Sequence, residues 1–251
     1  MIPRICMALA VASGLPAGAA TLLSTGFESP TYTTGPIAGQ NGWAVFGTSV
    51  AAQVDSGVAQ SGSQAVEVIP SLASGQTGPY YGLSTSASVV EMSAYIYVAG
   101  SSNQSGWQFA ATGAGLEGFI GGIDIQPNGA IDLITLAGTD VGTFNYNAWQ
   151  LADFVFNFAT QTYNFSLNGT LLSSGVPFCG ANGTCTGANI PSFGDAFFDT
   201  FPATSANDIG YMDNITISSV APEPGSLMLL GAGLAALIAC RVRFQRWLNR
   251  G

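Results

Sequence analysis

Carboxylates are the only charged side chains over most of this chain. All but one of the 14 acidic residues lie between Thr21 and Val220, the exception being Glu223. The five basic residues are all arginines, Arg4 and four near the C-terminus, and histidine is absent from the sequence. The long middle region must therefore carry out any chemistry with carboxylates, amides, hydroxyls and backbone groups.

This composition excludes several classes of function for the middle region. Without histidine or lysine it has no imidazole base, no imidazole metal ligand and no amine for a Schiff base, which excludes serine triads and P-loop phosphate sites. Its acidic surface repels phosphate backbones, because nucleic-acid binding depends on neutralisation by cations. Carboxylate catalysis, calcium binding and binding without catalysis remain, and no nucleic-acid partner is expected.

Acidic residues near the end of the middle region form the candidate metal site. The candidate calcium ligands are four aspartates: Asp195, Asp199, Asp208 and Asp213. Asn207 and Asn214 lie beside them, and calcium takes roughly six to eight oxygen ligands from such carboxylates, amides and carbonyls. The spacing matches no EF-hand, so the alternative is a set of surface charges that keeps an exported protein soluble.

The middle region contains two cysteines, Cys179 and Cys185. They bound the segment CGANGTC, in which Asn182-Gly183 favours a tight turn, so the two sulfurs can close a small ring. In an oxidising compartment the sequence therefore predicts a disulfide between Cys179 and Cys185. A metal site is the alternative, but the region lacks other soft ligands.

β-strands are expected to position these residues. Apolar and polar residues alternate over 153–158 and 163–167, which predicts a β-hairpin, whereas no ten-residue stretch keeps a helical period. Asn-Gly pairs at 128–129 and 168–169 mark further turns. The other predicted strands cover 64–69, 89–98, 107–111, 149–158 and 209–217. Many short strands at close spacing predict an all-β fold, a jelly-roll β-sandwich over 21–220.

Several segments of this region resemble concanavalin A-like and laminin-G-like domains. The resemblance rests on Trp149, on the hairpin with its NGT turn at 168–170, and on the closing segment YMDNI at 211–215. GFES at 26–29 with QNGW at 40–43 is similar to the first strand of such exported domains. Because this fold hosts lectins, glycosidases and adhesion modules, the resemblance implies the fold and not the activity. The three tryptophans of the region are expected to pack in the core or at strand edges.

A secreted carbohydrate-active enzyme, hydrolase or lyase, is the alternative function. Retaining glycosidases need two carboxylates about 5 Å apart, and on this sandwich these are two glutamates on one face of a strand. The nearest segment has Asp124 between Gly122 and Gln126, where glutamates are required. Glu117 could approach the same strand, and Asp124 is expected to face Asp132 across the turn at 128–129. No complete catalytic pair is present, so no catalytic residues and no enzymatic activity are predicted.

Residues 1–20 have the three parts of a secretory signal peptide. Arg4 is followed by an apolar stretch over 5–15 and by small residues up to Ala20. Cleavage is expected close to Ala19 or Ala20. A buried N-terminal helix is the alternative, although Pro16 ends the apolar run where a cleavage site belongs.

The C-terminal segment 221–251 carries three ordered features. Pro222, Glu223 and Pro224 precede an uncharged apolar stretch over 225–240, which predicts a transmembrane helix, and an arginine-rich tail follows. The arginines predict that the tail stays in the cytoplasm and the acidic region outside. A plain single-span anchor is the alternative to the interpretation that follows.

In this order the three features resemble the PEP-CTERM sorting signal, although Ala221 stands where valine is commonest. The resemblance implies an exported bacterial protein whose partner is an exosortase, a membrane cysteine transpeptidase that cleaves near Pro-Glu-Pro. The protein would then be anchored transiently in the inner membrane before it reaches the cell surface or extracellular matrix.

The predicted organisation is a signal peptide (1–20), a β-sandwich ectodomain (21–220) and a sorting signal (221–251). The predicted function is that of an exported surface or matrix protein without enzymatic activity. Its candidate roles are glycan binding and adhesion, with exopolysaccharide as the candidate partner and calcium as the one candidate cofactor.

Overall fold

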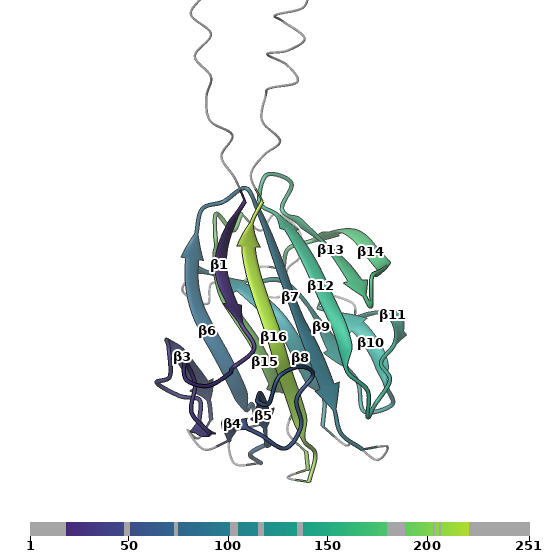
Figure 1. The fold of residues 1–251 in the computed structure, drawn as a ribbon. Helices are drawn as coiled ribbons and strands as arrows, with labels where there is room; N and C mark the ends of the chain where they lie inside the picture. Colours follow the sequence, from purple (N-terminus) through teal and green to yellow (C-terminus); the bar gives the residue numbers. More distant parts are fainter. Residues whose placement is uncertain are drawn as a thin grey trace, which may run out of the picture. The chain divides into compact units, whose positions relative to one another are not determined.

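The alternation of apolar and polar residues builds two antiparallel β-sheets that pack face to face (Figure 1). The computed structural model describes residues 19–47, 51–72, 75–100, 105–114, 118–134, 138–179, 189–202, 204–205 and 207–220. All named elements within these residues are strands, and the described chain includes no helix that could span a membrane. The all-β prediction is therefore confirmed.

The first sheet has nine strands. They are β1 (Ala20–Thr25), β2 (Gly35–Pro36), β4 (Ala52–Asp55), β5 (Ala65–Val68), β7 (Val89–Val98), β12 (Gln150–Asn157), β13 (Thr162–Leu167), β14 (Thr170–Pro177) and β16 (Gly210–Ser219). Their order is β14-β13-β12-β7-β16-β5-β4-β2, and β1 pairs with the end of β16. In Figure 1, β12, β7 and β16 lie side by side in this sheet.

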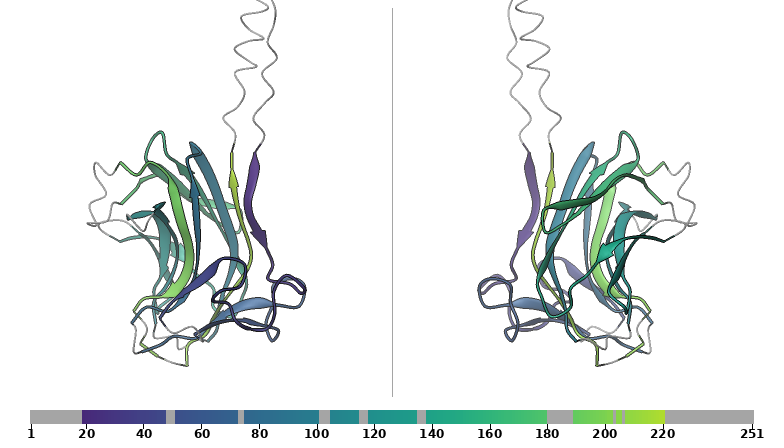
Figure 2. Two further views of the ribbon diagram at one scale, coloured as in Figure 1. Left: turned by 90° about the vertical axis from the view of Figure 1, so that its left-hand side faces the viewer. Right: turned by 90° about the vertical axis from the view of Figure 1, so that its right-hand side faces the viewer.

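The second sheet has seven strands. They are β3 (Trp43–Phe46), β6 (Gly78–Thr85), β8 (Trp107–Gly113), β9 (Phe119–Ile125), β10 (Ala130–Leu133), β11 (Thr139–Thr143) and β15 (Phe193–Thr200). Their order is β11-β10-β9-β8-β15-β6-β3. The two views of Figure 2 show the sheets as two layers.

The two predicted hairpins and the turns at 128–129 and 168–169 are confirmed. β12 pairs with β13 so that Phe154 lies opposite Phe165 and Phe156 opposite Tyr163. The turn between β9 and β10 places Gly129 at a φ of 84°, a left-handed conformation that glycine adopts without steric cost. The predicted strand at 89–98 coincides with β7, and the one at 107–111 continues as β8 to Gly113.

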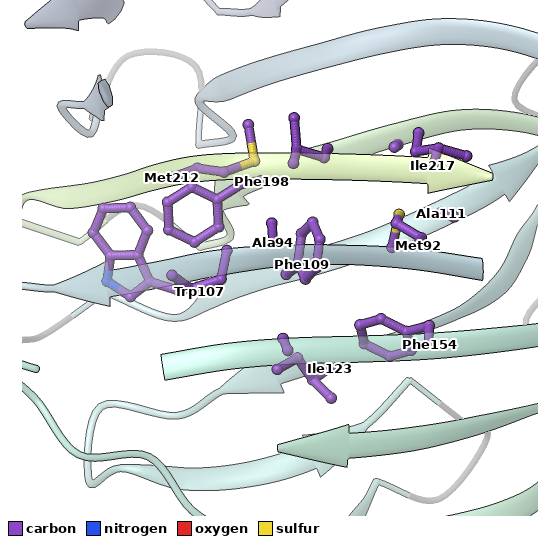
Figure 3. Packing of buried hydrophobic residues seen from close by; sticks show 14 of the residues in the cluster. Met92, Ala94, Trp107, Phe109, Ala111, Ile123, Phe154, Phe198, Met212 and Ile217 are labelled. Carbon is purple, nitrogen blue, oxygen red and sulfur yellow. The ribbon is translucent and has the colours of Figure 1, made fainter. Parts of the chain in front are cut away.

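The core lies between the sheets and is rich in aromatic side chains (Figure 3). Trp107 is fully buried and stacks on Phe198 with ring centroids 5.3 Å apart, while Phe109 meets Phe154 edge-on at 5.7 Å. Trp43 is also buried, as predicted. Trp149 differs, because it is half-buried just before β12 and packs against Tyr97 outside the core.

The two ends of the sandwich chain are neighbours. β1 runs antiparallel to β16 and places Ala20 opposite Ser219, so both chain ends leave the same end of the sandwich (Figure 1). The compact unit extends from Ala19 to Val220, so the predicted boundary at residue 20 falls inside β1. The predicted signal-peptide residues 1–18, the Pro222-Glu223-Pro224 motif and the predicted helix over 225–240 lie outside the described residues.

Candidate functional site

A row of polar side chains crosses the outer face of the seven-stranded sheet. Strand register places Asp132 opposite Asp124, Asp124 opposite Gln108, and Gln108 opposite Asp199. These positions alternate with core residues such as Trp107, Phe109 and Phe198, so their side chains point away from the core. We call these four residues the acidic row.

Amide groups bind two of the three carboxylates of the acidic row. Gln108 Nε2 donates to Asp124 Oδ1 at 2.6 Å, and Gln76 Nε2 donates to Asp199 Oδ2 at 2.6 Å. Asp199 is fully buried, and its Oδ1 has no hydrogen-bond partner in the part of the chain that the structure describes. The row therefore combines fixed acceptors with one unsatisfied buried oxygen.

Burial makes these carboxyls weak acids. It raises the pKa of Asp124 to about 6, an effect that the Gln108 hydrogen bond opposes and the nearby charge of Asp132 reinforces. It raises the pKa of Asp199 to about 7 against the hydrogen bond from Gln76. Since Thr21 to Val220 has no cationic side chain, nothing within the domain neutralises these groups. Near neutral pH Asp199 is therefore partly protonated, and the row carries less charge than its composition suggests.

A cavity of about 340 Å³ adjoins the acidic row. It is lined by Gly106, Gln108, Asp124, Gln126, Pro127, Phe201 and Pro202. Phe201 is 53% exposed, which is unusual for a large apolar side chain. The cavity lies where β8 begins and β9 and β15 end, near the Gly210 end of β16, because Gly210 packs on Trp107. It is therefore remote from the paired chain ends at Ala20 and Ser219.

The structure brings some predicted site residues together. Asp124 and Asp132 face each other across the β9–β10 hairpin, as predicted. Gly122 points to the same outer face, where it packs on Ala110, and Gln126 lines the cavity, so neither supplies the missing glutamate. Glu117 lies outside the described residues. Among the candidates that the structure describes, Asp124 is the one that lines the cavity.

The predicted calcium ligands are distributed over both sheets. Asp195 and Asp199 lie on β15 in the seven-stranded sheet, whereas Asp213 lies on β16 in the nine-stranded sheet. Asp208 accepts a hydrogen bond from Ser105 N. Among the described residues, no group of three acidic, cysteine or histidine side chains could hold a metal. The described residues do not bring the four aspartates together as one site, and calcium binding stays a prediction.

Asp213 instead ties a loop to the closing strand. Its Oδ2 accepts hydrogen bonds from Gln60 N at 3.0 Å and Ser61 N at 3.2 Å. Glu28 acts similarly, accepting from the backbone N–H groups of Ser63 and Gln64. The segments GFES and YMDNI therefore stabilise the strand-to-loop connections of the sandwich.

Cys179 is buried, and Cys185 lies outside the described residues, so the Cys179–Cys185 disulfide stays a prediction. Sequence reasoning missed Gln76, Gln108 and Phe201. Gln108 had a usable signal, because Trp107, Phe109 and Ala111 alternate around it and direct it outward.

A family model described as the PEP-CTERM protein-sorting motif matches residues 220–243. The chain carries a PEP-CTERM sorting motif. This motif indicates export and sorting at the membrane, in agreement with the order of Pro222-Glu223-Pro224, apolar stretch and arginine tail. No curated protein matches the chain in sequence.

Three solved structures resemble the sandwich at low sequence identity. "Cellulose induced protein, Cip1" has a TM-score of 0.55 and 18% identity over 81% of this chain and 100% of that chain. A chain from work on endo-acting O-glycanases of the human gut microbiota has a TM-score of 0.56 and 10% identity over 80% and 100%. A "Sialidase" has a TM-score of 0.54 and 10% identity over 74% of this chain but 18% of its own length. These likenesses establish a shared fold alone.

Proposed function

We propose that this is an exported bacterial surface or matrix protein whose sandwich binds neutral glycan chains at the acidic row without cleaving them. The observation that carries the proposal is the cavity in which Asp124, Gln108 and Gln126 lie beside the exposed Phe201. Sugar rings present hydroxyls at their edges and C–H groups on their faces, so amide and carboxyl groups next to an aromatic ring suit them. The carbohydrate-linked names of the structural neighbours are consistent with such a ligand.

Charge favours a neutral chain at this site. The carboxyls of the acidic row have raised pKa values and amide partners, so they accept hydrogen bonds from hydroxyls without a strong demand for a cation. Acidic polysaccharides would be repelled, because no cation between Thr21 and Val220 offsets their charge.

Substitutions at the cavity test this function. We expect the full-length protein, in a detergent without a sugar headgroup, to bind members of an array of neutral oligosaccharides. Phe201→Ala and Asp124→Asn should each lower the affinity for the best ligand, measured by calorimetry, by about tenfold, or about 1.4 kcal/mol. The controls are Leu171→Ala, another exposed apolar residue, and Asp140→Asn, an exposed aspartate on β11. Equal affinities in all four variants would contradict the proposed site.

Processing at the C-terminus is the second part of the proposed function. We expect mass spectrometry of the mature protein from exosortase-positive cells to find residues 225–251 removed. Replacing Pro222 and Pro224 by alanine should leave the tail in place. Retention of the whole segment from Gly225 to Gly251 in the unaltered protein would reject exosortase processing.

Hydrolysis is the alternative function, and the raised pKa of Asp124 favours it because a general acid works best when its pKa is near the working pH. Of the other two carboxyls of the row, Asp199 is fully buried and cannot touch a substrate, whereas Asp132 is half-buried and lies directly opposite Asp124. Inverting glycosidases need two accessible carboxyls roughly 6.5–9.5 Å apart. Turnover of any bound glycan that Asp124→Asn abolishes would replace binding by hydrolysis as the function.

A further inference from the structure

A second set of side chains suited to a ligand lies on the outer face of the nine-stranded sheet. Tyr97 on β7 is opposite Tyr211 on β16, and Trp149 lies on the other side of Tyr97. The ring centroid of Tyr97 is 5.5 Å from that of Trp149 and 5.8 Å from that of Tyr211. We call these three residues the aromatic row. Trp149 and Tyr97 are only half-buried, so their rings are partly open to solvent.

Hydrogen bonds fix one end of the aromatic row. Tyr211 Oη donates to Glu67 Oε1 at 3.0 Å, and Gln53 Nε2 donates to Glu67 Oε2 at 2.6 Å. Glu67 on β5 thus supplies a carboxylate beside the rings. This arrangement holds the row in place before any ligand arrives, which lowers the entropy cost of binding.

Further along the same strands lies a hollow of about 280 Å³. Its polar lining consists of Glu91, Ser93, Asp153, Thr216 and Ser218. Register places Asp153 and Thr216 on either side of Ser93, and Ser218 opposite Glu91. We call this feature the acidic hollow. Within the described residues, neither the Glu91 nor the Asp153 carboxylate accepts a hydrogen bond.

The two carboxylates of the acidic hollow, Glu91 and Asp153, repel each other electrostatically. Burial raises the pKa of Asp153, and the charge of Glu91 raises it further. No lysine, arginine or histidine between Thr21 and Val220 can pair with either group. A cation from outside the domain would remove this repulsion, and it would also be attracted by the net negative charge of the whole sandwich.

We propose that this face binds a linear cationic glycan, an amino-sugar chain whose free ammonium groups enter the acidic hollow while its rings lie on the aromatic row. Glu91 and Tyr97 both point outward from β7 and are six residues apart, a distance of about 20 Å along a strand. An oligosaccharide spans such a distance, whereas a single metal ion or amine does not. The hydroxyls of Ser93, Thr216 and Ser218 line the acidic hollow and offer partners for the sugar hydroxyls next to the ammonium groups.

This inference rests on the proposed function in so far as the ligand is a glycan, but it concerns the opposite face of the sandwich. At the acidic row, glutamine amides already donate hydrogen bonds to the carboxyls, and the proposed ligand there is a neutral chain. The acidic hollow has two carboxyls without partners, and it therefore selects for positive charge.

The test compares three hexasaccharides on the full-length protein in a detergent without a sugar headgroup. They are the hexamers of glucosamine, of N-acetylglucosamine and of glucose in β-1,4 linkage. We expect the glucosamine hexamer to bind at least about tenfold more tightly than the other two at this face, and its affinity to fall as salt rises.

Matched variants locate that binding. We expect the affinity for the glucosamine hexamer to fall by about fivefold or more in each of Asp153→Asn, Glu91→Gln and Trp149→Ala. Asp140→Asn removes the same charge from β11 and should change its affinity less than twofold. Thermal unfolding of each variant checks that the sandwich is intact.

Three results would overturn the inference. The first is equal affinity for the acetylated and free-amine hexamers. The second is loss of glucosamine-hexamer binding in Asp124→Asn but not in Asp153→Asn. The third is binding of hexalysine as tight as that of the glucosamine hexamer, which would indicate adsorption of any polycation. If neutral chains fail at the acidic row while the glucosamine hexamer requires Asp153, the proposed function fails and this inference stands. If neither the hexamers nor any neutral oligosaccharide of the array binds, both are rejected.

Discussion

Replacing Trp107 by alanine is expected to lower the free energy of unfolding by about 3 kcal/mol. Removing a buried aromatic side chain typically costs about 3–5 kcal/mol through lost apolar burial and a residual cavity. The lower end applies because the indole Nε1 has no acceptor among the described residues, so the substitution also removes an unpaired buried donor. The lost contacts include the stack on Phe198 and the packing against Gly210.

The measurement is the thermal unfolding of the sandwich followed by near-ultraviolet circular dichroism. A loss of this size lowers the melting temperature by about 6–12 °C in a domain of this length. Trp149→Ala is the matched control, because Trp149 is half-buried on the outer face and should cost less than about 1 kcal/mol. Similar losses in the two variants would contradict the placement of Trp107 in the core.

Asp199 is expected to make the sandwich less stable as the pH rises. Its pKa is about 7 in the folded protein against 3.8 ordinarily, so between about pH 4 and pH 7 the folded state binds more protons than the unfolded state. The stabilisation is fully present below pH 4 and is lost as the pH rises through 7. It amounts to a few kcal/mol, since each pKa unit is worth about 1.4 kcal/mol.

The variant Asp199→Asn isolates this effect. Asparagine keeps an oxygen for the Gln76 donor and carries no charge, so the variant should be as stable as the unaltered protein or slightly less stable below pH 4, and more stable at pH 8. Asp124 leaves a smaller dependence in the same direction, because burial raises its pKa to about 6. Asp140→Asn on the exposed edge strand is the control. A pH profile that Asp199→Asn leaves unchanged would contradict a charge buried at this position.

The local alternation of apolar and polar residues was sufficient to predict the strands, but it did not predict where the acidic side chains lie in space. Alternation around Phe154 and Phe156 predicted the β12–β13 hairpin, because inward and outward residues differ in polarity there. From the sequence alone, Asp199 would be expected to be an exposed charge. In the structure it is covered by Gly78 and Gln76, which lie more than a hundred residues earlier in the chain. Asp195 and Asp213 are close in sequence, but β15 and β16 belong to different sheets, so proximity along the chain did not become proximity in space.

The candidate site was predictable in part for the same reason. Asp124 and Asp132 follow from one hairpin and its Asn-Gly turn, which is a local feature. The cavity needs Gly106 and Phe201 from segments that meet only when β8 and β15 pair, and no short-range signal encodes that pairing. The aromatic row likewise joins Tyr97 on β7, Tyr211 on β16 and Trp149 just before β12, which are far apart in the sequence.

The pairing of β1 with β16 also determines how the domain would carry mechanical load. A pull applied at Ser219, where the sorting segment begins, and resisted by a ligand in the cavity near Gly210 would run lengthwise along β16. β16 is bonded to β7 on one side and to β5 and β1 on the other, so such a force loads its ladders in shear. Many hydrogen bonds must then break together instead of one after another. This strand arrangement therefore favours a sandwich that stays folded when it is pulled along β16.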